Sequence, residues 1–253
     1  MTAAAWFTPP APRIIAHRGL ATHAPENTLL AFVSALALGV THLETDVHAS
    51  SDGVAVLSHD PDFGRLTGVA TPILQLSRAE LGRIDLGDEQ RVPTLREALD
   101  AFPEARFNID IKSDEAVRPT VRAILAENAV DRVLITSFDD ARRRAAVAQL
   151  PGVATSASSR GVLLAFLASR VPIAAAWRLS LKGIDALQVP ETYRGVTIVT
   201  PQLVKAAHES GVEVHVWTID DPADMRRLFA LGVDGIITDR ADIGVDVVGR
   251  ISR

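Results

Sequence analysis

Eight short apolar segments, separated mostly by longer segments with helical periodicity, are the feature of this sequence that most limits its fold. The short segments are nearly continuous runs of Val, Ile, Leu and other β-prone residues, a pattern typical of parallel strands buried on both faces. Glycine follows several of the helical segments, where a C-terminal cap is expected. The expected strands are 13–17, 41–47, 106–112, 132–138, 152–158, 185–190, 213–219 and 234–239, and the expected helices are 27–38, 94–101, 115–128, 139–149, 160–169, 201–210 and 222–231.

Eight parallel strands with helices between them close most simply into a (β/α)8 TIM barrel, for which 253 residues is an ordinary length. A doubly wound open sheet is the alternative, but no G-x-G-x-x-G motif follows the first strand. We therefore expect residues 13–247 to form a single TIM-barrel domain, preceded by an N-terminal tail of residues 1–12.

One stretch departs from this alternation, directly after the second expected strand. Asp52-Gly53 is a strong hairpin signal, and residues 54–57 are expected to return antiparallel to that strand. Such a hairpin places His59 beside the second strand. Residues 60–93, rich in Gly, Asp and Pro, are expected to form a small insertion on the barrel rim.

Composition limits the partners of the chain. A net charge of -5 argues against nucleic acid, and the absence of cysteine excludes thiolate chemistry and fits a reducing compartment, so we expect a cytoplasmic protein. Residues 1–12 lack the basic and apolar regions of a signal peptide. The most membrane-like run, 161–177, is interrupted by Arg170 and Pro172. We expect neither a transmembrane segment nor peripheral membrane contact, and the oligomeric state stays open.

Carboxylates recur at the carboxyl ends of the expected strands, where the catalytic residues of a barrel lie. Glu44 and Asp46 stand two apart on one strand, so both side chains point to the same face. They form either a salt-bridged surface pair or a site for a hard cation such as Mg²⁺ or Ca²⁺. Asn108, Asp110 and Lys112 repeat this spacing on the next strand, which favours the cation site.

His17 and His59 are expected at the same rim as these carboxylates. Either histidine alone is more often a core residue than a catalyst, but beside carboxylates, Arg18 and Lys112 both become candidate general acids or bases. This combination suits hydrolysis of a phosphodiester, in which one histidine accepts a proton from the attacking oxygen and the other protonates the leaving alkoxide. The metal and Arg18 would hold the phosphoryl oxygens.

Seven short motifs contain or adjoin these polar residues. They are HRG (17–19), PENT (25–28), ETDV (44–47), VLSHD (56–60), NIDIK (108–112), VWT (216–218) and GIITDR (235–240). Each motif alone is weak, but their joint occurrence in this order over residues 13–243 is specific, and it resembles the glycerophosphodiester phosphodiesterase family. The resemblance implies a TIM barrel that cleaves glycerophosphodiesters to sn-glycerol 3-phosphate and an alcohol with a divalent metal.

The resemblance also implies a role for each site residue. Asp110 stands where the family usually has glutamate and is one methylene shorter, which bears on metal preference. The implied acid–base pair is His17 and His59, the implied ligands of Mg²⁺ or Ca²⁺ are Glu44, Asp46 and Asp110, and the implied substrate contacts are Arg18, Lys112 and Trp217.

Several alternatives stay open. The same site could act as a lysophospholipase D, with residues 60–93 and 161–177 lining a lipid groove. A catalytically inactive barrel that binds a metabolite or a protein is a further alternative, although the intact histidines and carboxylates argue against it. Asn27 or Thr28 is expected to cap the first helix, and Glu26 to face either the site or a neighbouring cation.

Overall fold

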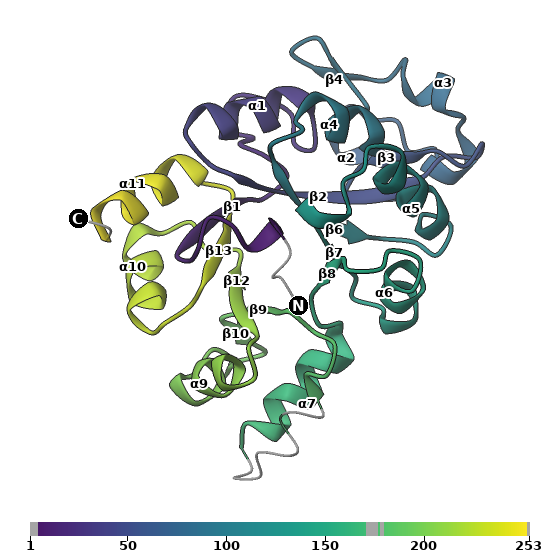
Figure 1. Cartoon of the computed structure of the whole chain (residues 1–253). Helices are drawn as coiled ribbons and strands as arrows, with labels where there is room; N and C mark the ends of the chain where they lie inside the picture. The colour runs from purple at the N-terminus through teal and green to yellow at the C-terminus, as the bar shows by residue number, and fades with distance from the viewer. Residues whose placement is uncertain (1–4, 171–176, 178–179, 252–253) are drawn as a thin grey trace.

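Eight parallel strands form a nearly closed barrel with helices around it in the computed structural model, which describes residues 5–170, 177 and 180–251 (Figure 1). A single bridge between Ser156 and Ala186 joins the first and last strands of the ring. The predicted TIM barrel is therefore confirmed. Around the ring the strands are β8 (Ala154–Thr155), β7 (Val133–Thr136), β6 (Arg106–Ile111), β2 (His42–Ala49), β1 (Arg13–Ala16), β13 (Gly235–Thr238), β12 (Glu213–Trp217) and β9 (Ala186–Pro190).

Among the described helices that surround the barrel, one was not predicted from the sequence. This is helix α11, which ends the described chain and contains Gly244 and Gly249, two residues of low helical propensity. A side chain at Gly244 would meet Ile14 at 2.8 Å, so the glycine lets α11 pack closely on β1. The helices are α1 (Leu29–Ala37), α4 (Leu95–Ala101), α5 (Val117–Ala126), α6 (Asp140–Val147), α7 (Ser159–Ala168), α9 (Pro201–Glu209), α10 (Pro222–Ala230) and α11 (Ala241–Ile251).

The predicted hairpin after β2 is present. Strand β3 (Ala55–Leu57) pairs antiparallel with β2 and places Leu57 opposite Val47. The insertion that follows packs around its own small group of buried apolar side chains, which includes Phe63 and Ile73. Its elements are α2 (Gly64–Thr67), η2 (Ile73–Gln75), α3 (Arg78–Leu81), β4 (Asp85–Gly87) and β5 (Gln90–Arg91).

Strand alternation separates an outer core from the barrel interior. On β2, Leu43 and Val47 face the helices and belong to the large outer core, in which Phe32 of α1 meets Phe107 of β6 edge to face at 5.6 Å. Glu44 and Asp46, the intervening residues, point into the barrel and line its cavity. The interior therefore receives the polar residues that the sequence pattern placed on one face.

The amino end of the barrel is closed by Trp6, in the short helix η1 (Ala5–Phe7). Trp6 is fully buried, and its ring meets that of His42 edge to face at 4.8 Å. His42 Nε2 lies 2.7 Å from the Trp6 carbonyl oxygen, and Nδ1 lies 2.9 Å from Thr41 Oγ1. Burial lowers the pKa of His42 to about 3, so its ring is neutral in the folded protein at neutral pH.

The free energy of unfolding is expected to fall as the pH drops below 6.5, because His42 takes up a proton in the unfolded chain but not in the folded one. Above pH 6.5 both states are neutral and the residue adds no pH dependence. At pH 5 the loss from this residue is about 2 kcal/mol. Urea unfolding from pH 7.5 to 5 should show the wild type losing about that much more stability than His42→Gln. A variant of the exposed His23, His23→Gln, should follow the wild type, and equal slopes for all three proteins would contradict the prediction.

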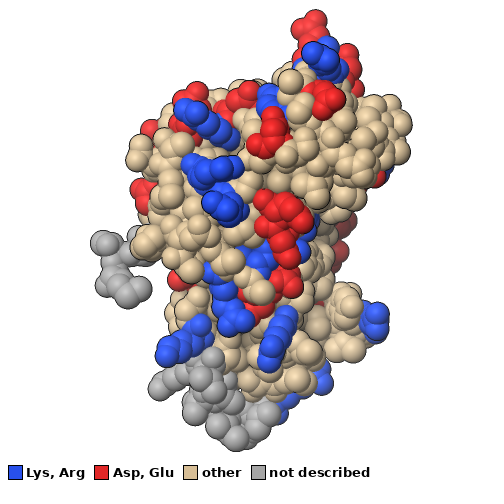
Figure 2. Space-filling model, turned by 90° about the vertical axis from the view of Figure 1, so that its right-hand side faces the viewer, with Lys and Arg blue, Asp and Glu red and all other residues tan. Residues whose placement is uncertain are grey.

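A short hairpin and a short 3-10 helix complete the described elements, and the surface carries charges of both signs. Strands β10 (Thr192–Tyr193) and β11 (Val196–Thr197) form a short hairpin before α9, and η3 (Val130–Arg132) precedes β7. Figure 2 shows charges of both signs interspersed on the upper part of one face, whereas blue side chains predominate lower down. Within the described ranges, no helix is both long enough and apolar enough to span a bilayer.

Candidate active site

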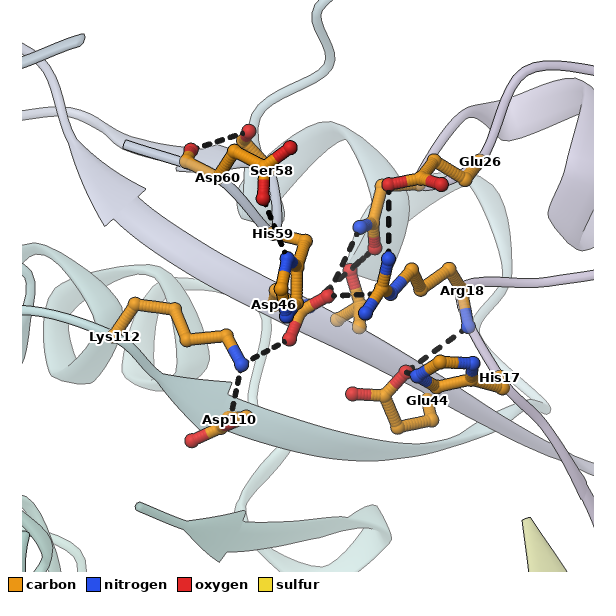
Figure 3. Close-up of polar contacts among 12 residues, drawn as sticks. His17, Arg18, Glu26, Glu44, Asp46, Ser58, His59, Asp60, Asp110 and Lys112 are labelled. Atoms are coloured by element: carbon orange, nitrogen blue, oxygen red, sulfur yellow. Dashed lines mark hydrogen bonds and ion pairs between the residues drawn. The ribbon is translucent and has the colours of Figure 1, made fainter. Parts of the chain in front are cut away.

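A cavity of about 540 Å³ opens at the carboxyl ends of the barrel strands. Its polar part comes from β2 and β6 and from the segments that follow β1 and β3 (Figure 3). Its other side is apolar. The structure brings every site residue predicted from the sequence to this one cavity. These residues are His17, Arg18, Glu44, Asp46, His59, Asp110, Lys112 and Trp217.

The carboxylates come from two paired strands. The register of β2 and β6 places Asp46 opposite Asp110 and Glu44 opposite Asn108, so the inward carboxylates lie side by side. Lys112 Nζ lies 2.7 Å from Asp46 Oδ1 and 2.7 Å from Asp110 Oδ2. Burial lowers the pKa of Lys112, but the charges of Asp110 and Asp46 outweigh burial and hold its pKa above the ordinary value. The lysine therefore stays cationic between the two carboxylates.

The three carboxyl groups differ in their affinity for protons. Burial and the charge of Asp46 raise the pKa of Glu44 to about 8, and burial also raises the pKa of Asp110. Burial acts in the same direction on Asp46, but Lys112 and Arg18 outweigh it and hold the pKa of Asp46 below its ordinary value. Glu44 and Asp110 therefore hold a proton more readily than ordinary carboxyl groups do, and Asp46 holds one less readily.

These donors fit a hard divalent cation in their chemistry. Carboxylate oxygens are the ligands that Mg²⁺ and Ca²⁺ prefer, and Asp110 Oδ1 is buried without a hydrogen-bond partner among the described residues. A dication would also counteract the burial and the charge of Asp46 that raise the pKa of Glu44. Within the described chain, no three such side chains are already drawn together around one point. Lys112 instead lies between two of them.

His17 follows β1 directly and is oriented by a carboxylate. Its Nδ1 lies 2.6 Å from Asp239 Oδ1, and its Nε2 lies 3.9 Å from Glu44 Oε2. Burial lowers the pKa of His17, but the hydrogen bond with Asp239 and the charge of Glu44 outweigh burial, so the pKa lies above its ordinary value. The ring therefore presents Nε2 to the cavity near Glu44, whose own pKa is raised.

Arg18 has a backbone conformation that brings it into the site. Its φ of 54° lies in the left-handed region and is followed by Gly19 at 84°, where any side chain would strike Ala31 at 2.7 Å. The Arg18 amide donates to Glu44 Oε2 at 3.0 Å, and its Nε lies 3.2 Å from Asp46 Oδ2. The tight turn after β1 thus holds both carboxylates of β2.

Glu26 connects Arg18 with the rim insertion. Arg18 Nη1 donates to Glu26 Oε1 at 3.1 Å, and Arg65 Nη2 donates to the same oxygen at 2.6 Å. Arg65 also donates through Nε to Asp60 Oδ2 at 2.6 Å, and Asp60 Oδ1 lies 2.8 Å from Nδ1 of His59. Of the two expectations for Glu26, the structure supports contact with a neighbouring cation.

Asn27 is a residue of the site that the sequence did not reveal. Thr28 is the N-cap of α1 and accepts from the Ala31 amide, which leaves the Asn27 side chain for the site. Asn27 Nδ2 donates to Asp46 Oδ2 at 3.1 Å, and Thr45 Oγ1 donates to Asn27 Oδ1 at 2.7 Å. Asn27 has a positive φ of 56°, a conformation that asparagine adopts more readily than most residues. The sequence alone does not give φ, so it offered no signal for this contact.

Removing the Asn27 side chain is expected to lower kcat about 10-fold with little change in KM, because it orients Asp46 without touching the predicted substrate contacts. The variant to measure is Asn27→Gly, since glycine keeps the positive φ. Asn27→Ala should lose the same activity and be less stable by about 1 kcal/mol. A wild-type kcat for Asn27→Gly would show that Asp46 does not depend on this hydrogen bond.

The side of the cavity away from the carboxylates is apolar. Trp217, at the end of β12, meets Phe138 edge to face at 6.1 Å. Phe166 of α7, Tyr193 of the β10–β11 hairpin and Ile198 line the same side. A substrate whose charged group binds near the carboxylates and Lys112 can therefore place an apolar part along this side of the cavity.

A barrel that gathers histidines, carboxylates and cationic side chains at the carboxyl ends of its strands defines an enzyme that acts on an anionic substrate. The model of the glycerophosphoryl diester phosphodiesterase family matches residues 17–243. A protein described as probable glycerophosphodiester phosphodiesterase 2 of Mycobacterium tuberculosis is 42% identical, over 92% of this chain and 89% of its own. This chain therefore belongs to the glycerophosphoryl diester phosphodiesterase family.

Further relatives agree in sequence and fold. The solved structure of an Oleispira antarctica phosphodiesterase in complex with the product sn-glycerol-3-phosphate has a TM-score of 0.78 and 26% identity, over 96% of this chain and 98% of that one. A human lysophospholipase D is 27% identical over 89% of this chain and 82% of its own. The predicted family, its barrel and the expectation of a phosphodiesterase are confirmed, whereas the roles of individual residues stay predictions.

Proposed function

We propose that this protein hydrolyses glycerophosphodiesters to sn-glycerol 3-phosphate and an alcohol, with His17 and His59 as the acid–base pair and a bound divalent cation. The observation that carries the proposal is that both histidines line one cavity with three carboxylates and two cationic side chains, although they come from different elements (Figure 3). A barrel that only binds a metabolite or a protein needs no pair of proton-transfer groups.

The two histidines have matching surroundings, which supports equivalent roles. Each ring directs Nδ1 to a carboxylate, Asp239 for His17 and Asp60 for His59. For Nε2 of His59, no hydrogen-bond partner is found among the described residues, and that of His17 faces Glu44 at 3.9 Å. Such a carboxylate fixes the ring orientation of a general base or acid. One ring would accept the proton of the attacking oxygen and the other would protonate the leaving alkoxide.

Arg18 and Lys112 are proposed to bind the phosphate of the substrate. Both line the cavity, and both are held by Asp46, so their positions are set before the substrate arrives. Trp217 is proposed to pack against the glycerol or the alcohol, since it lies beside Phe138 on the apolar side of the cavity. The complex of the Oleispira relative with sn-glycerol-3-phosphate supports a product of this kind.

Mg²⁺ or Ca²⁺ is proposed to bind the oxygens of Glu44, Asp46 and Asp110. When bound, such an ion supplies charge that stabilises phosphoryl oxygens. Asp46 is held by Asn27, Arg18 and Lys112, so it is the most firmly positioned of the three.

A lysophospholipase D activity in the same site is the second candidate, and the apolar wall favours it. Phe138, Phe166 and Ile198 would lie along an acyl chain attached to the glycerol or the alcohol. The human relative described as a lysophospholipase D supports this candidate as well. Small deacylated substrates use only the polar part of the cavity and leave this wall uncovered.

Comparing turnover of glycerophosphocholine with that of lysophosphatidylcholine tests both candidates. The first candidate predicts release of choline and sn-glycerol 3-phosphate from glycerophosphocholine with added Mg²⁺ or Ca²⁺. Turnover of lysophosphatidylcholine alone would assign the second. Failure of both substrates, and of a panel with other head groups, at every metal concentration would remove the hydrolase proposal.

A further inference from the structure

The outer face of α7 carries three leucines that no described part of the protein covers. Leu163, Leu164 and Leu167 are 55%, 47% and 52% exposed, and their spacing places them on one face of the helix. Ala165 and Ala168, on the opposite face, are buried against the barrel. Figure 1 shows α7 extending away from the strands at the lower side of the molecule. This face is therefore an apolar surface turned to the outside.

The apolar surface continues into the mouth of the cavity. Leu163 lines the cavity, as do Phe138 and Tyr193, which are 62% and 58% exposed. Leu164 and Leu167 extend the same surface outward along α7. Single exposed leucines are common on soluble proteins, but a continuous apolar patch beside a cavity marks an interaction site.

The charged residues of the segment that carries α7 have one sign. Every charged residue between Asp140 and Asp185 is basic, in a chain whose net charge is -5. Arg160 lies in the first turn of α7, and Arg170 and Lys182 follow the helix. All three are exposed, and none forms an ion pair with a described residue. The predominance of blue side chains in the lower part of Figure 2 agrees with this sequence pattern. The patch thus combines exposed leucines with unneutralised positive charge.

We propose that α7 and the adjoining rim of the cavity dock on a membrane surface that contains anionic phospholipids. Leucines of an amphipathic helix enter the interface between headgroups and acyl chains, and flanking Arg and Lys contact the anionic headgroups. A second copy of this chain fits less well, because pairing two such faces brings Arg160 and Arg170 of one copy near the same residues of the other. Docking in this way turns the cavity mouth toward the bilayer. Peripheral contact of this kind was not expected from the sequence.

Sedimentation with lipid vesicles tests the proposal on the full chain. Wild-type protein should bind vesicles of phosphatidylglycerol and phosphatidylcholine at least about 10-fold more tightly than vesicles of phosphatidylcholine alone. Leu164→Gln/Leu167→Gln should lower binding to the anionic vesicles by about 10-fold or more. Arg160→Gln/Lys182→Gln should remove the preference for anionic lipid.

Matched controls separate docking from general changes in the protein. Leu74 and Leu125 are each 49% exposed, in the insertion and on α5, so Leu74→Gln/Leu125→Gln should bind vesicles as the wild type does. Leu164 and Leu167 do not line the cavity, so their variant should hydrolyse soluble glycerophosphocholine at the wild-type rate. The His17→Ala protein should bind vesicles normally, which keeps the result independent of the proposed activity.

Three outcomes would overturn the proposal. The first is a wild-type protein that does not sediment with anionic vesicles at any lipid concentration at which the vesicles remain intact. The second is an equal loss of binding in the α7 variant and the Leu74/Leu125 control. The third is a wild-type dimer that Leu164→Gln/Leu167→Gln converts to a monomer, without vesicle binding by either form.

Discussion

Replacing His17 by alanine is expected to lower kcat for glycerophosphocholine at least about 100-fold, because the ring is proposed to transfer a proton in the transition state. The ring is held for this role by Asp239, at 2.6 Å from Nδ1, and it presents Nε2 to the cavity. KM should change little, since the phosphate contacts of Arg18 and Lys112 remain. Steady-state kinetics on the two proteins measures the effect.

His59→Ala is expected to lose kcat to a similar extent for the same reason. The double variant should be little slower than either single variant, because groups that act in one transition state are not additive. Circular dichroism and urea unfolding should show that both variants are folded. Near-normal turnover in either single variant would remove that histidine from the mechanism.

Asp239→Asn provides a graded control for His17. It should lower kcat about 10- to 100-fold, less than the loss of the ring itself, because it weakens the orientation of the ring without removing it. Asp60→Asn should act in the same way on His59. If a variant of the carboxylate lost more activity than the alanine variant of its own histidine, the carboxylate would have a role beyond orientation.

Removing divalent metal with EDTA is expected to abolish hydrolysis, and added Mg²⁺ or Ca²⁺ is expected to restore it. Burial and the charge of Asp46 raise the pKa of Glu44 to about 8, and a bound dication would favour the ionised form of Glu44 at neutral pH. Activity measured across a metal titration after chelation checks the prediction. Full activity in excess EDTA would exclude a required exchangeable ion.

Glu44→Gln identifies the ligands within the same experiment. It should raise the metal concentration needed for half-maximal activity by at least about 10-fold, whereas Asp110→Glu, which keeps the charge, should change it far less. Glu26→Gln is a nearby control, because Glu26 contacts Arg18 and Arg65 but none of the carboxylates of β2. An unchanged titration in Glu44→Gln would argue against ligation by this residue.

The strand pattern allowed much of the site to be predicted, and β2 shows why. Residues two apart on a strand share a face, so Glu44 and Asp46 had to point the same way wherever the strand lay. The Asp52-Gly53 turn fixes the return of β3 by local geometry, which brings His59 to the barrel rim. Parallel strands place their carboxyl ends together, so Asp110 on β6 reaches the same cavity.

Contacts between distant segments could not be predicted in this way. Asn27 bonds to Asp46 only because the turn after β1 folds back over β2 with a positive φ at Arg18 and at Asn27 itself. Trp6 closes the barrel beneath His42, although it lies in the segment expected as a tail. Neither contact leaves a periodic signal, because each depends on where two separate segments meet.

By itself, the sequence determined the alternation of strands and helices, the faces on which the carboxylates lie and the order of the family motifs, since all of these depend on local spacing. Only the tertiary structure decided which oxygens Lys112 and Arg18 hold, and which side of α7 is left uncovered. The reason is that local periodicity orients a side chain relative to its own helix or strand. Closing the barrel then decides whether that side chain meets another segment or the solvent.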